Sequence, residues 1–296
     1  MREQIKKKYT DKKKSRKFVF IATIALIIMI PLMGKNSMSI SWSNNQNFAG
    51  EKMSTKGKYA LNIERFDREL ALIQLNPAQF VMIHKRWNLI IPTIEKELKK
   101  AGLPNDLKYI PVIESALRES VTSSAGAAGI WQFMPATAQR YGLVVNTFVD
   151  ERMDVEKSTT AAIRYFQDLY KKFNNRTLAA AAYNRGENGL QTSMNNQFSR
   201  GYYDLWLNTE TSRYVFRLLA TKHIREHKHD FFNKNELWPM YTYFPTKNIS
   251  VKKIDNLAER ANNNGYAYYE VKKLNPRILK NSLPEGQWDI QVFSEK

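Results

Sequence analysis

One glutamate is a candidate acid because of its position in the chain. Residues 107–113 form a largely apolar run with helical spacing, and Glu114 ends it. A carboxyl group that leaves an apolar wall is desolvated, and at the end of a helix it also meets the negative end of the dipole. Both effects raise the pKa above about 4.3, so that the group stays protonated as a general acid. The same pattern is also typical of a solvated surface glutamate.

Small residues follow the glutamate and predict a surface that a polymer can approach closely. Residues 123–129 read SSAGAAG, and such side chains suit a tight loop where backbone comes near a ligand. Directly after this loop, Trp131 and Met134 would supply apolar walls, and Gln132 would supply orienting hydrogen bonds. The sequence therefore predicts a groove beside Glu114.

A second cluster fits a different chemistry. His223, Glu226 and His227 match the H-x-x-E-H pattern of one group of zinc proteases, and helical spacing places both histidines on one face. Residues 222–230 (KHIREHKHD) are equally an ordinary charged run at a helix end. We favour the charged run and expect neither a metal nor another cofactor; stoichiometric and essential zinc in the purified protein would overturn that expectation.

The apolar periodicity predicts a mainly α protein. Expected helices cover residues 61–75, 77–101, 105–115, 133–141, 156–173, 176–184 and 210–227, with Pro92 as a kink and Gly102 as a C-cap in the second. No strand alternation occurs before about residue 240. Beyond it, strands at 248–253 and 287–293 enclose helices at 255–263 and 268–274, which predicts a β-α-α-β module separate from the helical body.

The N-terminus predicts export. Residues 1–17 are strongly basic, and residues 18–33 (FVFIATIALIIMIPLM) carry no charge. The positive flank is expected to stay in the cytoplasm and residues 40–296 to lie outside it. The apolar run falls between a signal-peptide core of about 7–15 residues and a membrane helix of about 20, so a cleaved signal and a retained anchor both stay open. The long basic leader favours the anchor.

Charge and cysteine content exclude several classes of protein. The chain has 46 Lys and Arg against 28 Asp and Glu, a net charge of +18, which favours anionic partners. It has no cysteine, which excludes disulfides, thiolate metal sites, a cysteine nucleophile and an N-terminal lipid-bearing cysteine. No zinc-finger, RNP or P-loop spacing occurs, so nucleic acid is not an expected partner.

Four ordered segments carry a resemblance to a known family. Residues 113–143 (IESALRESVTSSAGAAGIWQFMPATAQRYGL) resemble the catalytic region of the soluble-lytic-transglycosylase family, whose fold is related to goose-type lysozyme. DERMDVEKSTTAA at 150–162, AAAYNRGENG at 180–189 and ETSRYV at 210–215 stand in the family's order. The helices at 61–102 are similar to the membrane-bound lytic murein transglycosylase D subgroup. The resemblance covers about residues 60–240.

The match implies roles for individual residues. Glu114 corresponds to the catalytic acid and then base. Substrate-binding positions are implied for Ser123, Gln132, Met134, Tyr183, Asn184, Glu210 and Tyr214, and supporting positions for Ser115, Gly129 and Trp131. For Tyr183 and Tyr214 a role as core aromatics with satisfied hydroxyls stays open, because a buried tyrosine normally finds a partner.

The resemblance also implies an architecture, namely a goose-lysozyme-like helical catalytic domain with a helical N-terminal extension and a small C-terminal β-α-α-β module. The expected segments are a basic cytoplasmic leader (1–17), a signal or membrane anchor (18–34), a polar linker (35–58), the helical extension (59–100), the catalytic domain (101–240) and the module (241–296). The module resembles a degenerate LysM repeat, and glycan binding and a purely structural role both stay open for it.

The implied activity is non-hydrolytic cleavage of the bond between N-acetylmuramic acid and N-acetylglucosamine in peptidoglycan, which leaves 1,6-anhydro ends during wall turnover or remodelling. The alternatives are a lysozyme-type hydrolase and a non-catalytic wall-binding protein. A hydrolase normally needs a second carboxylate; the candidates are Asp150, Glu151, Asp154 and Glu187. The expected partners are glycan strands with their acidic stems and, through residues 18–33, the membrane. Protein partners are not indicated.

Overall fold

The computed structural model describes residues 46–233, 238–242 and 244–294. The chain divides into two units, residues 1–43 and 44–296, and the description below concerns the second. The predicted leader at 1–17 and anchor at 18–34 lie outside the described residues. Across the described residues, no helix has both the length and the hydropathy that crossing a bilayer requires.

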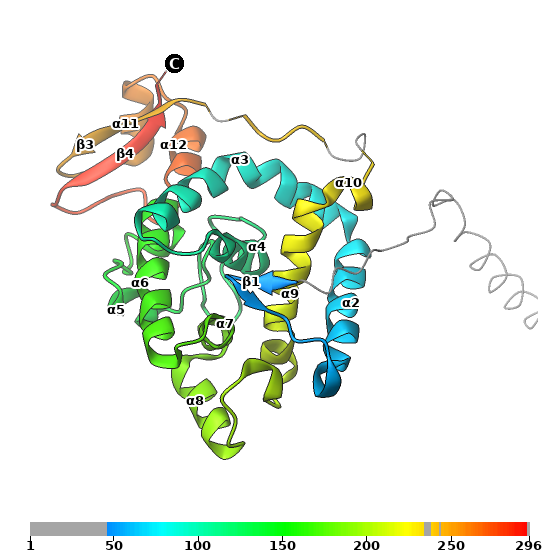
Figure 1. Cartoon of the computed structure of the whole chain (residues 1–296). Helices are drawn as coiled ribbons and strands as arrows, with labels where there is room; N and C mark the ends of the chain where they lie inside the picture. The colour runs from blue at the N-terminus through cyan, green and yellow to red at the C-terminus, as the bar shows by residue number, and fades with distance from the viewer. Residues whose placement is uncertain (1–45, 234–237, 243, 295–296) are drawn as a thin grey trace, which may run out of the picture. The chain divides into compact units, whose positions relative to one another are not determined.

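The described chain is mainly α, as predicted (Figure 1). The helices are α2 (Leu61–Gln74), α3 (Pro77–Lys100), α4 (Tyr109–Ser115), α5 (Pro135–Arg140), α6 (Val155–Phe173), α7 (Arg176–Arg185), α8 (Glu187–Asn196), α9 (Thr209–Glu226) and α10 (Lys228–Phe231). Pro92 lies inside α3 without ending it, and Gly102 after the helix has a φ of +65°. The predicted helix at 105–115 divides into a 3₁₀ turn, Asn105–Lys108, and α4. Helix α8 was not predicted, since Leu190 is its one buried residue.

The centre of the helical body is the alanine-rich helix α7. Ala179 to Ala182 are all fully buried, and α7 packs against both α6 and α9. Because alanine projects one methyl group, the three helix backbones can approach closely. This packing fixes α7 and α9 relative to each other, and the later motifs of the sequence lie on these two helices.

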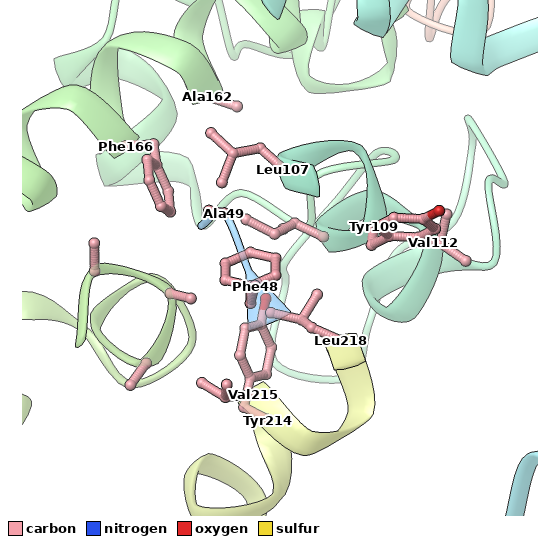
Figure 2. Close-up of a cluster of buried hydrophobic side chains, with 14 of the residues drawn as sticks. Phe48, Ala49, Leu107, Tyr109, Val112, Ala162, Phe166, Tyr214, Val215 and Leu218 are labelled. Atoms are coloured by element: carbon pink, nitrogen blue, oxygen red, sulfur yellow. The ribbon is translucent and has the colours of Figure 1, made fainter. Parts of the chain in front are cut away.

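The expectation of a linker through residue 58, with no strand before residue 240, is wrong for residues 47–53. Strands β1 (Asn47–Phe48) and β2 (Glu51–Lys52) form a short hairpin. Phe48 is 0% exposed and lies in the cluster that includes Leu107, Phe166 and Val215 (Figure 2). Two-residue strands are too short to show alternation in the sequence, and only the tertiary structure reveals that Phe48 fills the core.

The C-terminal module has the predicted β-α-α-β order. It consists of β3 (Thr246–Val251), α11 (Leu257–Asn263), α12 (Tyr268–Leu274) and β4 (Trp288–Phe293), and the strands pair antiparallel. Its own core joins both strands and both helices.

The module is not separate from the helical body, contrary to expectation. Val149 belongs to the module's core and pairs with Ile278. On either side of this bridge, the amide of Asp150 donates to the Arg277 carbonyl at 2.8 Å, and the amide of Leu279 donates to the Phe148 carbonyl at 2.8 Å. Backbone pairing across this edge holds the module against the segment that follows α5.

Candidate active site

Glu114 lies in the last turn of α4, as the sequence predicted. Residues 109–112 of this helix are buried, and the Ser115 hydroxyl donates to the Pro111 carbonyl at 2.9 Å, which stabilises the helix end. Ala116 and Leu117 follow with φ of 52° and 58°. Two consecutive non-glycine residues in the left-handed region form a strained backbone conformation at the end of a helix. The chain thus turns sharply directly after Glu114.

The electrostatic environment of Glu114 favours its protonated form. Burial raises the pKa of Glu114, and the negative charge of Glu210 acts in the same direction. The Tyr214 hydroxyl, which donates to Oε1 of Glu114 at 2.6 Å, and the positive charge of Arg217 oppose the rise. The net effect is a pKa above the ordinary value, so the carboxyl group keeps its proton to a higher pH than a solvated glutamate does.

Replacing Tyr214 by phenylalanine is expected to move the alkaline limb of the pH profile to higher pH. The tyrosine hydroxyl stabilises the carboxylate, so its loss raises the pKa of Glu114 further, and a general acid is lost only as pH rises through that pKa. The loss of one positioned hydrogen bond should also lower kcat about 3–10-fold. The measurement is kcat against pH beside Tyr269→Phe, an exposed tyrosine in α12. An unmoved or lowered limb would contradict the assignment.

The loop of small residues is stabilised by its own hydrogen bonds. The amide of Ser123 donates to the Ala127 carbonyl at 2.8 Å, and the Ser123 hydroxyl accepts from the Ala127 amide at 3.0 Å. Gln132 has a φ of 50°, and its side-chain amide donates to the Gly129 carbonyl at 2.8 Å. Ser123 and Met134 are exposed, as are Ser124 and Ala125, and Gln132 is half-buried, so a ligand can reach this segment.

A buried arginine that the sequence analysis missed connects the two ends of this loop. The Arg152 guanidinium donates to the carbonyls of Gly126 at 2.7 Å and Phe133 at 2.8 Å, and it forms a two-point ion pair with Asp150. Gly129 packs so closely on Arg152 that a Cβ at Gly129 would lie 1.7 Å from the Arg152 carbonyl oxygen. In the sequence, Arg152 cannot be told apart from an exposed arginine. The only indication was the loop of small residues, whose carbonyl groups need hydrogen-bond donors.

Trp131 faces the core, so the expectation that it walls a groove is wrong. It is 2% exposed, and its indole N–H donates to the Thr159 hydroxyl at 3.0 Å. Tyr183 donates its hydroxyl to the Trp131 carbonyl at 2.8 Å. The Trp131 ring therefore anchors the loop from inside, and Met134 remains as the apolar group at the surface.

The motifs at 180–189 and 210–215 lie on α7 and α9 and are connected to Glu114 by hydrogen bonds. The Asn184 amide donates to Oε1 of Glu210 at 2.9 Å and accepts from the Thr211 hydroxyl at 2.8 Å. Tyr214 is 1% exposed, so it reaches Glu114 from inside the protein and does not line a sugar subsite as expected. Tyr183 and Tyr214 therefore both fit the other role left open for them, that of packed aromatic side chains whose hydroxyl groups have hydrogen-bond partners.

The four candidates for a second carboxylate are all engaged elsewhere. Asp150 pairs with Arg152, Glu151 with Lys157, Asp154 with Arg277 and Glu187 with Arg140. Glu210, which was not among these candidates, is the carboxylate whose charge acts on Glu114. Glu210 is therefore a further candidate for the second carboxylate of a hydrolytic mechanism.

The H-x-x-E-H residues do not gather a ligand set. The His223 and His227 rings lie 4.4 Å apart, but Nδ1 of His223 lies 3.1 Å from the Gln46 amide nitrogen and Nδ1 of His227 lies 2.9 Å from the His223 carbonyl. Within residues 46–233, 238–242 and 244–294, no three His, Cys, Asp or Glu side chains could hold a metal ion together. Within the charged run at this helix end, His223 is buried.

Comparisons with known proteins match the region that contains this site. Residues 91–205 match the family model of the Transglycosylase SLT domain. The membrane-bound lytic murein transglycosylase D of Escherichia coli (strain K12) is 40% identical over 136 residues, 44% of this chain and 30% of that protein. The soluble lytic murein transglycosylase of the same strain is 31% identical over 116 residues, 36% of this chain and 18% of that protein.

Among solved structures, the 70 kDa soluble lytic transglycosylase of Escherichia coli aligns with 68% of this chain and 41% of its own, at 20% identity and a TM-score of 0.43. This chain spans less than a third of the length of the curated relatives named above. The family match includes α4, the small-residue loop and α7, where the sequence resemblance placed its motifs. Residues 91–205 of this chain are therefore similar to the Transglycosylase SLT domain, and part of the chain is similar in sequence to membrane-bound lytic murein transglycosylase D.

Proposed function

We propose that this protein is a peptidoglycan lytic transglycosylase in which Glu114 acts first as acid and then as base. The observation that carries the proposal is the environment of Glu114 inside an SLT domain. Burial raises the pKa of the carboxyl group, and Tyr214 orients the group through a bond of 2.6 Å. A carboxyl group kept protonated and fixed in this way meets the requirement for a general acid.

In the proposed reaction, Glu114 gives its proton to the oxygen between N-acetylmuramic acid and N-acetylglucosamine as the glycosidic bond breaks. The Glu114 carboxylate then takes the proton of the C6 hydroxyl on the muramoyl sugar. That oxygen forms the new bond to C1, which closes the 1,6-anhydro ring without consuming water. The Tyr214 hydroxyl stabilises the carboxylate between the two steps.

The energetics of this route agree with one acid at the site. The attacking hydroxyl belongs to the substrate, and such proximity can contribute about 7–11 kcal/mol to lowering the barrier. One positioned acid and base typically adds about 10²–10⁴-fold to the rate. A second protein carboxylate would be needed only if water had to be activated.

Mass spectrometry of sacculi digested by the protein tests the reaction class. We expect muropeptides lighter by one water than reducing-end products, because the ring closes within the sugar. Reducing-end products would indicate a lysozyme-type hydrolase. Binding to sacculi without released fragments would indicate a non-catalytic wall protein.

Replacing Glu210 by glutamine separates the same alternatives by a second route. In a transglycosylase we expect activity to stay within about tenfold, since Glu210 takes no proton in the reaction. The alkaline limb should move to lower pH, because the charge that raises the pKa of Glu114 is gone. This shift is opposite to that of Tyr214→Phe. Complete loss of activity, with a folded variant, would instead identify Glu210 as the base of a hydrolase.

We further propose a location in the cell envelope, where this substrate occurs, with residues 18–33 as signal or anchor. N-terminal sequencing of the mature protein distinguishes the two. Residues 101–240 are proposed to carry catalysis and residues 59–100 to extend the site. For residues 241–296 we favour a structural role over glycan binding. The Arg277 carbonyl accepts a hydrogen bond from the amide of Asp150, and the Asp150 carboxylate holds Arg152, whose guanidinium bonds the small-residue loop.

A further inference from the structure

Side chains from three parts of the chain bind the end of α4. Four consecutive residues there, 113–116, each accept a hydrogen bond from a side chain that lies outside the helix. The bonds run from Arg217 to the Ile113 carbonyl at 3.3 Å, from Tyr214 to the Glu114 carboxyl group at 2.6 Å, from Arg118 to the Ser115 carbonyl at 3.1 Å and from Arg86 to the Ala116 carbonyl at 3.1 Å. The donors come from α9, from the turn after α4 and from α3. The position of Glu114 is therefore tied to two long helices of the body.

The conformation of the turn after Glu114 requires such support. The last carbonyl groups of a helix have no partner within the helix, and they carry the negative end of its dipole, where cations are favourable. Ala116 and Leu117 also have φ of 52° and 58°, and strained backbone of this kind persists only where the surroundings hold it in place. Both residues are buried. The guanidinium donors thus stabilise the geometry in which the chain leaves α4.

Arg86 is the donor that belongs to the helical extension, and it precedes the 91–205 region that matches the family model. Its side chain is half-buried, and both burial and the positive charge of Arg118 lower its pKa. The segment of α3 that carries Arg86 is itself fixed. The carbonyl of Lys85 accepts from the Tyr241 amide at 2.8 Å, and Nζ of Lys85 lies 4.7 Å from the centre of the Tyr241 ring and 5.3 Å from that of Trp238. Arg86 therefore reaches the turn from a rigid support.

We infer that Arg86 is a positioning residue, which keeps Glu114 in contact with Tyr214 by binding the carbonyl of the strained turn directly after the glutamate. This inference rests on the proposed function, and it gives the helical extension a part in the reaction. Once the Ala116 carbonyl is released, the turn can relax, and the Glu114 carboxyl group moves away from the Tyr214 hydroxyl. Because small displacements of a catalytic group lower the rate strongly, the effect falls on kcat and leaves substrate binding unchanged.

Steady-state kinetics on glycan strands separate positioning from substrate binding. Arg86→Met removes the donors and keeps the aliphatic length, Arg86→Lys retains a charged donor, and Lys96→Met removes an exposed cation of the same helix as the matched control. We expect kcat to fall about tenfold in Arg86→Met, with KM within about twofold of the wild type. Arg86→Lys should recover most of the loss, and Lys96→Met should match the wild type. A raised KM with unchanged kcat would overturn the inference, since Arg86 would then bind substrate.

A double-mutant cycle with Tyr214→Phe tests whether Arg86 acts through the contact between Glu114 and Tyr214. If it does, the two substitutions remove the same interaction, and Arg86→Met should lower kcat only about 2–3-fold further in the Tyr214→Phe background. The alkaline limb of Arg86→Met should also move to higher pH, as in Tyr214→Phe, because the hydroxyl that lowers the pKa of Glu114 is withdrawn. A full tenfold further loss, or an unmoved limb in Arg86→Met, would show that Arg86 acts independently of this contact.

Infrared titration without substrate separates this inference from the proposed function. The difference spectrum between a protein and its Glu114→Gln version isolates the carboxyl band of Glu114, and its pH dependence gives the pKa of that group. Arg86→Met should raise this pKa relative to the wild type, and Lys96→Met should not. If the pKa rises while the wild type releases no fragments from sacculi, the proposed function fails and the positioning contact stands. If the wild type forms anhydro products while Arg86→Met changes neither the pKa nor kcat, the function stands and the inference is overturned.

Discussion

Glu114→Gln is expected to lower the rate of glycan cleavage by about 10²–10⁴-fold while the protein stays folded. Glutamine has the same shape as glutamic acid but has no proton to give, so neither the acid step nor the base step can occur. The Tyr214 hydroxyl can still donate to the amide oxygen, so the environment of the side chain is preserved. The melting temperature should therefore stay within about 2 °C of the wild type. Release of muropeptides from sacculi and thermal unfolding measure the two effects.

Glu119 provides the matched control for this substitution. It lies five residues further along, it is partly buried, and burial raises its pKa as well. It has no contact with Tyr214 that could orient it toward the site. Glu119→Gln should leave cleavage within about threefold of the wild type. If Glu119→Gln were inactive and Glu114→Gln active, the acid would be Glu119; equal loss in both would point to a general electrostatic effect.

Gly129→Ala is expected to be strongly destabilising. A methyl group at this position would lie 1.7 Å from the carbonyl oxygen of Arg152 and 2.5 Å from its carbonyl carbon, so one backbone segment must move. The φ of +77° adds a strain of about 1–2 kcal/mol for any residue with a side chain. With a further 1–3 kcal/mol for overpacking, the loss is on the order of 4 kcal/mol. A chain of this size should then melt about 10 °C lower.

Gly126→Ala isolates the contribution of the backbone angle from that of the clash. Gly126 lies in the same loop with a φ of +87°, but an added Cβ there would have no atom within 4 Å. We expect a loss of about 1 kcal/mol, a few degrees in melting temperature. Equal melting temperatures of the two variants would contradict the close approach of Gly129 to Arg152. Activity should fall mainly in Gly129→Ala, because the displaced segment carries the bond from Arg152 to Phe133.

Local patterns in the sequence were sufficient for the helices that carry the site. Apolar spacing predicted α2, α3 and α6 closely, because each buries one face whose period can be read directly from the chain. Helices α7 and α9 were also predicted closely, although residues 177–182 of α7 are all buried. Glu114 at the end of α4 and the irregular loop after it could also be read in advance, since an apolar run and a series of small residues are local features. Three of the four resembling segments lie within residues 91–205, which match the family model, and the fourth, at 210–215, lies beyond them.

Long-range contacts had to come from the tertiary structure. Three side chains depend on partners that are distant in the chain: Phe48 in the core, Trp131 facing inward and Arg152 beneath the loop. A sequence pattern can indicate that a residue is buried, but it does not show which residues surround it. The same is true of Tyr214, which bonds a glutamate 100 positions away. The sequence motif indicated that Tyr214 belongs to the site. The burial of its side chain shows that it contacts Glu114 from the interior of the protein.

The sequence by itself predicted that this protein is mainly helical, that four of its segments resemble the lytic transglycosylases, and that Glu114 is the candidate acid. Only the tertiary structure decided the electrostatic environment of that acid. Glu210, Tyr214 and Arg217 all lie on α9, whereas Glu114 lies on α4, so their opposing effects on the pKa depend on how these two helices pack together. Likewise, Arg86 reaches the turn after Glu114 only because α3 lies beside the end of α4. Interactions of this kind depend on separation in space, which the order of residues along the chain does not specify.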